Sequence, residues 1–120
     1  MKVLLVDDSA LARRSMRQIL VAAGYDVVEA EDGMIALERY FIEKPDVVIL
    51  DLVMRGMYGL DVLTKLREMD PAACVVVVSA DVQKSSQTLV EEAGAKGFLS
   101  KPAQPARVLD TIRQAMEETR

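Results

Sequence analysis

Residues 47–51, with the sequence Val47-Val48-Ile49-Leu50-Asp51, are a short apolar run that ends in a carboxylate. Four consecutive apolar residues of this kind predict a strand buried on both faces, as strands of parallel sheets are. Similar runs occur at residues 3–6 and 75–78. The longer stretches between the runs carry apolar residues three or four positions apart, which is typical of amphipathic helices. In residues 32–44 we expect one helix face to bury Ala36, Leu37, Tyr40 and Phe41.

Strands and helices are predicted to alternate outward from this run in both directions. The expected strands are residues 3–6, 26–30, 47–50, 75–78 and 97–100, and the expected helices are 9–23, 32–44, 60–69, 83–93 and a last one from 104. Five such repeats predict one α/β domain over residues 1–120, with a parallel sheet covered by helices on both faces. Half of an eightfold barrel fits the same pattern. An open, doubly wound sheet is favoured, because a closed barrel needs about 250 residues.

The composition excludes several classes of protein. Hydrophobic residues make up 51% of the chain, enough for a core without disulfides or structural metal. The net charge of −4 argues against a nucleic-acid surface, because phosphate backbones are bound by basic patches. The lone cysteine, Cys74, is expected to be a buried small hydrophobe, with a reactive thiol as the minor alternative. Without a signal peptide or a membrane-length apolar run, we expect a soluble, cytoplasmic protein that contacts no membrane.

Polar side chains follow the predicted strands at the points where they end. They are three acids, one hydroxyl and one amine, namely Asp7, Asp8, Asp51, Ser79 and Lys101. Open parallel sheets bind ligands outside the carboxyl ends of their strands, so we expect these groups to lie at one edge. Helix capping fully explains Ser9 and Asp32 and could explain Asp8 or Ser79. It explains Asp51 and Lys101 poorly.

The chemistry of these groups favours phosphoryl transfer. Two carboxylates at 4 Å repel each other by about 4 kcal/mol at an effective dielectric of 20, so a cation or a proton must offset the charge. Oxygen ligands suit Mg²⁺, and a chain without histidine is poorly suited to zinc. Mg²⁺, a carboxylate nucleophile, a hydroxyl donor and a lysine are together the parts that phosphoryl transfer needs.

Over its whole length the sequence resembles the receiver domain of response regulators, the family that includes single-domain chemotaxis regulators. The motifs that carry the resemblance are Val6-Asp7-Asp8-Ser9, Asp51-Leu52-Val53-Met54 with Gly59, Ser79-Ala80, and Gly97-Phe98-Leu99-Ser100-Lys101-Pro102. Each motif alone is weak, but together, in this order and at strand ends, they are specific. The resemblance implies a flavodoxin-like sheet with strand order 2-1-3-4-5.

The resemblance also implies a role for each site residue. Asp51 accepts a phosphoryl group from a histidine kinase or a small phosphodonor. Asp8, Asp51 and the backbone carbonyl of Val53 bind Mg²⁺, and Asp7 contributes through water. Lys101 pairs with the phosphoryl oxygens.

A switch is implied around the same site. Ser79 moves to hydrogen-bond a phosphoryl oxygen, and Phe98, at the position of the family's switch aromatic, rotates inward. The alternative for Phe98 is an ordinary core residue of an edge strand. The Lys101–Pro102 peptide bond is expected to be cis.

The sequence departs from the family at several positions. Arg55 replaces a frequent proline and adds a positive charge near an acidic site. In the family, the residues at the positions of Val53 and Asp81 tune the hydrolysis of the phosphoryl group. An apolar Val53 cannot orient the attacking water, whereas Asp81 can.

The predicted fourth helix is suited to respond to phosphorylation. It is polar and poor in strong helix formers, with the run Ser85-Ser86-Gln87-Thr88. We therefore expect the output face to comprise this helix, the fifth strand and the last helix.

Two forms of signalling protein fit these features. One is a stand-alone receiver, monomeric or dimerising on phosphorylation, that binds a downstream protein and is not an enzyme toward other substrates. The other is the receiver segment of a larger regulator with a DNA-binding or enzymatic output. A haloacid-dehalogenase-type phosphatase is disfavoured, because its second acid would have to replace Val53. A flavodoxin-type electron carrier is disfavoured by Asp7 and Asp8, which would repel the flavin phosphate.

Overall fold

Five strands and five helices alternate in the computed structural model, which describes residues 1–81 and 83–119. They are β1 (Lys2–Val6), α1 (Ala10–Ala22), β2 (Asp26–Ala30), α2 (Gly33–Glu43), β3 (Val47–Leu50), α3 (Gly59–Met69), β4 (Val75–Ser79), α4 (Lys84–Glu92), β5 (Gly97–Ser100) and α5 (Pro105–Thr119). Every predicted element is present, and the bounds differ only at terminal residues. Residues 82 and 120, which the predicted domain includes, lie outside the described residues.

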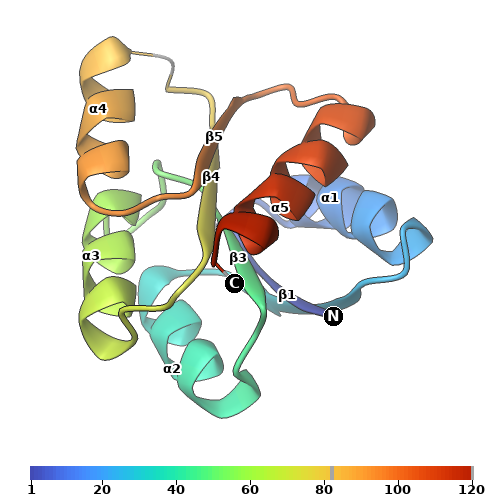
Figure 1. The fold of residues 1–120 in the computed structure, drawn as a ribbon, viewed down its shortest axis with the longest axis horizontal. Coiled ribbons are helices and arrows are strands. Elements are labelled where there is room, and N and C mark those ends of the chain that lie inside the picture. Colours follow the sequence, from blue (N-terminus) through green and yellow to red (C-terminus); the bar gives the residue numbers. More distant parts are fainter. Residues whose placement is uncertain (82, 120) are drawn as a thin grey trace.

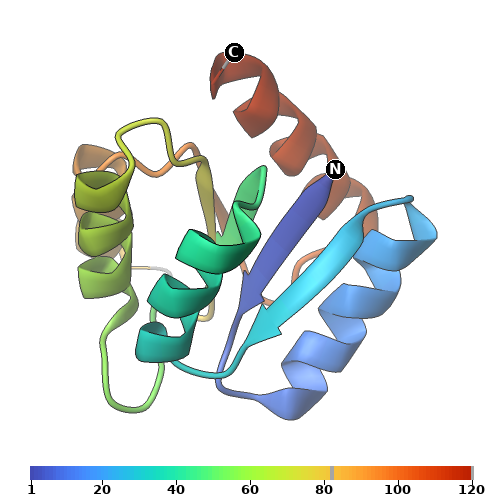
Figure 2. The same ribbon diagram turned by 90° about the horizontal axis from the view of Figure 1, so that it is seen from below.

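The five strands form one parallel sheet in the order β2-β1-β3-β4-β5. This arrangement confirms the predicted doubly wound fold, with β1 and β3 as neighbours near the centre. Figure 1 shows α1 and α5 on one face of the sheet and α2, α3 and α4 on the other. The view in Figure 2 shows the same division. A parallel sheet needs both layers, because its strands are apolar on both faces.

The decisive apolar run of β3 contributes to two separate cores. Val48 and Leu50 pack in the cluster that includes residues of α2, α3 and α4. Val47 and Ile49 pack in the cluster that includes residues of α1 and α5. Side chains alternate between the faces of a strand, so an uninterrupted apolar run is what a doubly covered sheet requires. Cys74 is buried in the second cluster, as expected.

The predicted apolar face of α2 is wrong at one position. Ala36 and Tyr40 are buried, but Phe41 is 73% exposed. The hydroxyl of Tyr40 donates a hydrogen bond to Asp70 (2.7 Å), which directs this side chain toward the end of α3. With Ala36 and Tyr40 facing the core, Phe41 falls on the outer side of the helix.

The helices that follow β1 and β2 begin at side-chain caps, as predicted. The hydroxyl oxygen of Ser9 accepts a hydrogen bond from the amide of Ala12 (3.1 Å). The carboxylate of Asp32 accepts one from the amide of Ile35 (2.8 Å). These caps satisfy amides that have no partner within the helix, so Ser9 and Asp32 have structural roles. Among the described residues, no helix combines the length and the apolar character needed to cross a membrane.

Candidate functional site

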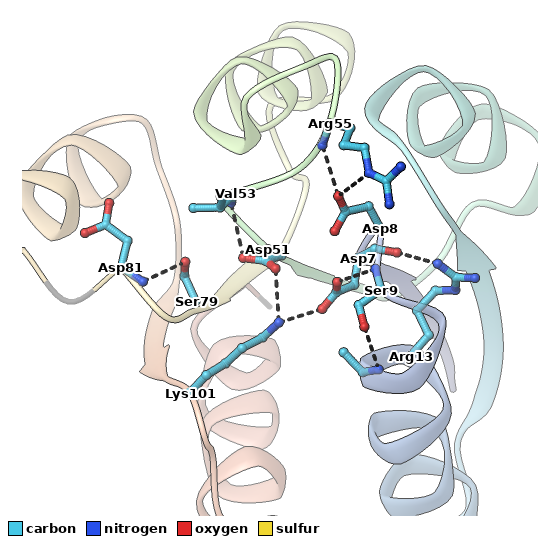
Figure 3. A network of polar contacts seen from close by, with 11 residues as sticks. Asp7, Asp8, Ser9, Arg13, Asp51, Val53, Arg55, Ser79, Asp81 and Lys101 are labelled. Atoms are coloured by element: carbon cyan, nitrogen blue, oxygen red, sulfur yellow. Dashed lines mark hydrogen bonds and ion pairs between the residues drawn. The ribbon is translucent and has the colours of Figure 1, made fainter.

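The polar residues predicted to gather at strand ends lie at the carboxyl edge of the sheet. Asp7 and Asp8 follow β1, Asp51 follows β3, Ser79 is the last residue of β4, and Lys101 follows β5. Figure 3 shows their side chains close together at this edge. Asp7 and Asp51 are 5% and 7% exposed, and Ser79 is fully buried. Carboxylates with so little exposure to solvent need hydrogen-bond or charged partners within the protein.

Lys101 lies between two of the three carboxylates. Its Nζ donates hydrogen bonds to Oδ2 of Asp7 (2.7 Å) and Oδ2 of Asp51 (3.0 Å). Burial by itself would lower the pKa of the Lys101 ammonium, but the hydrogen bonds and charges of Asp7 and Asp51 outweigh it and raise this pKa above its ordinary value. The Lys101–Pro102 bond is cis, as expected. Lys101 is therefore a cation that offsets the repulsion between the strand-end carboxylates.

Replacing Lys101 with methionine is expected to lower the free energy of unfolding by about 2 kcal/mol, because two nearly buried carboxylates lose their ammonium partner. Urea denaturation of both proteins measures this difference. Because the folded-state pKa of Lys101 is raised, its contribution is complete below the ordinary lysine value of about 10.4 and disappears as the pH rises through the folded-state value. Lys65→Met, at an exposed position of α3, is the control. Equal losses in both variants would contradict a specific role for Lys101.

Asp8 has a different partner from Asp7 and Asp51. Its Oδ2 accepts a hydrogen bond from the backbone amide of Arg55 (3.1 Å) and lies 3.8 Å from Nε of the same residue. Figure 3 shows Asp8 directed toward Arg55, whereas Asp7 is directed toward Lys101. The positive charge expected near the site from Arg55 is thus in contact with a predicted Mg²⁺ ligand.

The donor atoms fit Mg²⁺ in kind, because carboxylate and carbonyl oxygens are its usual protein ligands. Within the described residues, however, no three acidic, histidine or cysteine side chains are grouped closely enough to hold a metal ion. In this structure Lys101 pairs with Asp7 and Asp51, and Arg55 pairs with Asp8. Val53 contributes its amide to Oδ1 of Asp51 (3.2 Å), while its side chain is 59% exposed.

Ser79 is connected to α4 through Asp81. The amide of Asp81 donates a hydrogen bond to Oγ of Ser79 (3.2 Å), and its carboxylate accepts one from Oγ of Ser86 (2.7 Å). The amide of Gln83 donates to the other carboxylate oxygen (3.1 Å). These bonds, that from Ser86 first, lower the pKa of Asp81 below its ordinary value. The end of β4 is therefore linked to the first turn of α4 by a continuous chain of hydrogen bonds.

Ser86→Ala is expected to raise the pKa of Asp81 toward its ordinary value, because the carboxylate loses the hydroxyl that stabilises its charge. A pH titration of the carboxyl carbon by NMR measures this change. Ser85→Ala, at the exposed neighbouring position, is the matched control and should leave the pKa in place. An unchanged pKa in Ser86→Ala would mean that the hydrogen bond does not persist in solution.

Arg13 is a part of the site that sequence reasoning missed. Its Nη1 donates a hydrogen bond to the backbone carbonyl of Asp7 (2.6 Å), and its Nε pairs with Glu29 on β2 (3.1 Å). When only the spacing of apolar residues is considered, an arginine in the first turn of a helix is predicted to lie on the solvent-exposed face. The position of Arg13 in the sequence, soon after the end of β1, was a signal that could have identified it, because the first turn of α1 lies close to the strand that precedes it.

Phe98 lies on the edge strand β5, half-buried against the core cluster of α2, α3 and α4. It also lines a hollow together with residues of α4 and α5, among them Gln87, Glu91 and Arg107. This position is compatible both with a core residue and with an aromatic side chain that rotates.

Comparison with known proteins identifies the family. The model of the response regulator receiver domain matches residues 3–113. Chemotaxis protein CheY of Thermotoga maritima is 40% identical over 114 residues, covering 94% of this chain and 95% of that protein. The sensory/regulatory protein RpfC of Xanthomonas campestris pv. campestris is 38% identical. That match covers 100% of this chain and only 17% of RpfC.

A solved structure supports the same assignment. The CheX–CheY–BeF3–Mg²⁺ complex of Borrelia burgdorferi matches with a TM-score of 0.90 and 32% identity, covering 93% of this chain and 86% of that one. The fold agreement extends over nearly the whole chain. The chain belongs to the response regulator receiver domain family of two-component signalling proteins.

Proposed function

We propose that this chain is a phosphorylation-controlled switch whose phosphoryl acceptor is Asp51. The observation that carries the proposal is the environment of its carboxylate. Asp51 follows the central strand β3 at the carboxyl edge of the sheet, and its Oδ2 is 3.0 Å from the Lys101 ammonium. A carboxylate held beside a fixed cation is a suitable nucleophile for a phosphoryl group, because the cation offsets charge on the incoming oxygens.

In the proposed reaction, an oxygen of Asp51 attacks the phosphorus of a histidine-kinase phosphohistidine or of a small donor such as acetyl phosphate. A bond forms between that oxygen and phosphorus, and the bond to the leaving nitrogen or oxygen breaks, its electron pair remaining with the leaving group. Lys101 moves its hydrogen bond from the carboxylate to a phosphoryl oxygen. Water later attacks the phosphorus of the acyl phosphate, the bond between phosphorus and the Asp51 oxygen breaks, and inorganic phosphate leaves while the carboxylate is restored.

Asp8, Asp51 and the carbonyl of Val53 would hold Mg²⁺, with Asp7 contributing through water. When bound, the metal supplies positive charge that neutralises the phosphoryl oxygens. A cation bound at Oδ2 of Asp8 would compete with Arg55 for that atom. Asp7 keeps Lys101 directed toward the acceptor through its own hydrogen bond (2.7 Å).

The output of the switch is proposed to be a change in protein binding at α4, β5 and α5. Phosphorylation adds nearly two negative charges beside Ser79. If the Ser79 side chain moves so that its hydroxyl donates to them, its oxygen shifts away from the Asp81 amide, which weakens the connection from β4 to Asp81 and Ser86. Phe98 lines the hollow between α4 and α5, where a rotation of its ring would change the surface offered to a partner.

The alternative is the same switch within a larger regulator. RpfC, of which the matching segment is 17%, is a relative in which the receiver is one part of a long chain. In either case we propose a cytoplasmic signalling domain that promotes only its own phosphorylation and dephosphorylation, as a monomer or as a dimer formed on phosphorylation. A histidine kinase or phosphotransfer protein would be its donor, and neither nucleic acid nor membrane would be contacted directly.

Intact-mass measurement after incubation with acetyl phosphate tests the proposal. We expect a gain of one phosphoryl group in the presence of Mg²⁺ and none after its removal with EDTA. Hydroxylamine should reverse the gain, because acyl phosphates react with it whereas phosphate esters of serine do not. The absence of a gain, or a gain that resists hydroxylamine, would contradict the assignment of a carboxylate acceptor.

A further inference from the structure

One carboxylate oxygen of Asp8 carries both contacts with Arg55. The Arg55 amide donates to Oδ2 of Asp8 at 3.1 Å, and Nε lies 3.8 Å from the same atom. In Figure 3 the Asp8 side chain is directed toward Arg55 and away from Lys101. A cation that takes Oδ2 as a ligand therefore competes with the amide and the guanidinium for the charge of the same atom.

The surroundings of Arg55 are otherwise acidic. The hollow beside it is lined by Asp8, Glu31, Asp32 and Gly56 as well as by Arg55 itself. The Arg55 side chain is 94% exposed, so its ion pair with Asp8 is well solvated and contributes little to stability. The positive charge of Arg55 is instead expected to affect the binding of other cations to Asp8.

We propose that Arg55 lowers the Mg²⁺ affinity of this site by competing with the cation for Asp8. The inference rests on the proposed function and deepens it. Arg55 reduces the negative charge that attracts a divalent cation, and it occupies an oxygen that the cation needs. Both effects act in the same direction, so removing the guanidinium strengthens Mg²⁺ binding. The effect is electrostatic and acts between solvent-exposed charges, so it weakens as added salt screens them.

A charge series at this position tests the proposal. Wild type, Arg55→Gln and Arg55→Glu are titrated with MgCl₂ in the absence of any phosphodonor, and Kd is taken from the backbone amide NMR shifts of residues 7–9 and 51–55. We expect Kd to fall about three- to tenfold in Arg55→Gln and further in Arg55→Glu. The differences should shrink in about 1 M KCl, where the Debye length is about 3 Å.

Arg113→Gln is the matched control. It removes the same charge from an exposed arginine of α5 that pairs with Asp110 (2.9 Å), and it should leave Kd unchanged. Equal Kd values for wild type and Arg55→Gln would overturn the role of Arg55 and leave the metal site intact. A gain of the same size in Arg113→Gln would also overturn it, because net charge would then be the cause. If wild type and all variants fail to bind Mg²⁺, the proposed function fails and the inference fails with it.

Discussion

Asp51→Asn is expected to abolish the mass gain from acetyl phosphate. The amide is almost the same size as the carboxylate, and its oxygen can still accept the hydrogen bond from Lys101. The amide oxygen is neutral, however, and lacks the negative charge of the carboxylate, so it does not attack phosphorus at a useful rate. The fold should survive, because the substitution also removes one of the negative charges crowded at the strand ends.

Asp61→Asn is the control for this experiment. Asp61 is an exposed carboxylate in the first turn of α3, and its replacement should leave the mass gain unchanged. Peptide mapping of the wild type should place the modification on the peptide that contains Asp51. A gain that persists in Asp51→Asn would assign the acceptor to another carboxylate, with Asp7 and Asp8 the nearest alternatives.

Gly59→Ala is expected to lower the free energy of unfolding by about 3 kcal/mol, as overpacking of a tight site does. Gly59 is the first residue of α3, and its amide donates a hydrogen bond to the carbonyl of Leu52 (2.8 Å). A methyl group at this position would overlap the backbone carbonyl of Asp51 and lie 2.5 Å from Cα of Leu52. Both obstacles are backbone atoms, so either the helix or the strand end that carries the acceptor must move.

Whether Gly59→Ala loses or gains stability distinguishes the effect of packing from that of helix propensity. Alanine is the better helix former, so propensity alone would predict no loss of stability. Gly24→Ala is a useful comparison, because Gly24 has a φ of +94° and its added methyl would meet no atom within 4 Å. Its cost, about 1 kcal/mol, comes from backbone conformation alone. Thermal or urea unfolding compares the variants, and a Gly59→Ala protein as stable as wild type would contradict the close approach of α3 to Asp51.

Most of the fold could be predicted from the sequence, for a local reason. Whether a segment is a strand or a helix depends on which positions are apolar, and this period is recorded in the chain itself. The runs at residues 3–6, 47–50 and 75–78 are apolar at every position, so they had to be covered on both faces. Strand ends then meet at one edge of a parallel sheet, which is why Asp51 and Lys101 could be placed near each other although 50 positions separate them in the chain.

The partners of the site residues could not be predicted in the same way. The chain's motifs identify Asp8 as a ligand candidate and Arg55 as a nearby charge, but not that the two would be in contact. Ser86 was one polar residue in a weak helix, and the pattern did not show that its hydroxyl donates to Asp81 (2.7 Å). Phe41 was expected in the core and is exposed.

The sequence by itself therefore determined the order of elements, the sheet edge that carries the site and the residue types gathered there. Only the tertiary structure decided how those residues are paired: Lys101 with Asp7 and Asp51, Arg55 with Asp8, and Ser86 with Asp81. The physical reason is that periodicity reflects local backbone geometry, repeated every two or 3.6 residues. Pairing depends instead on rotamers and on the distance between helices and strand ends, which arise when the whole chain packs.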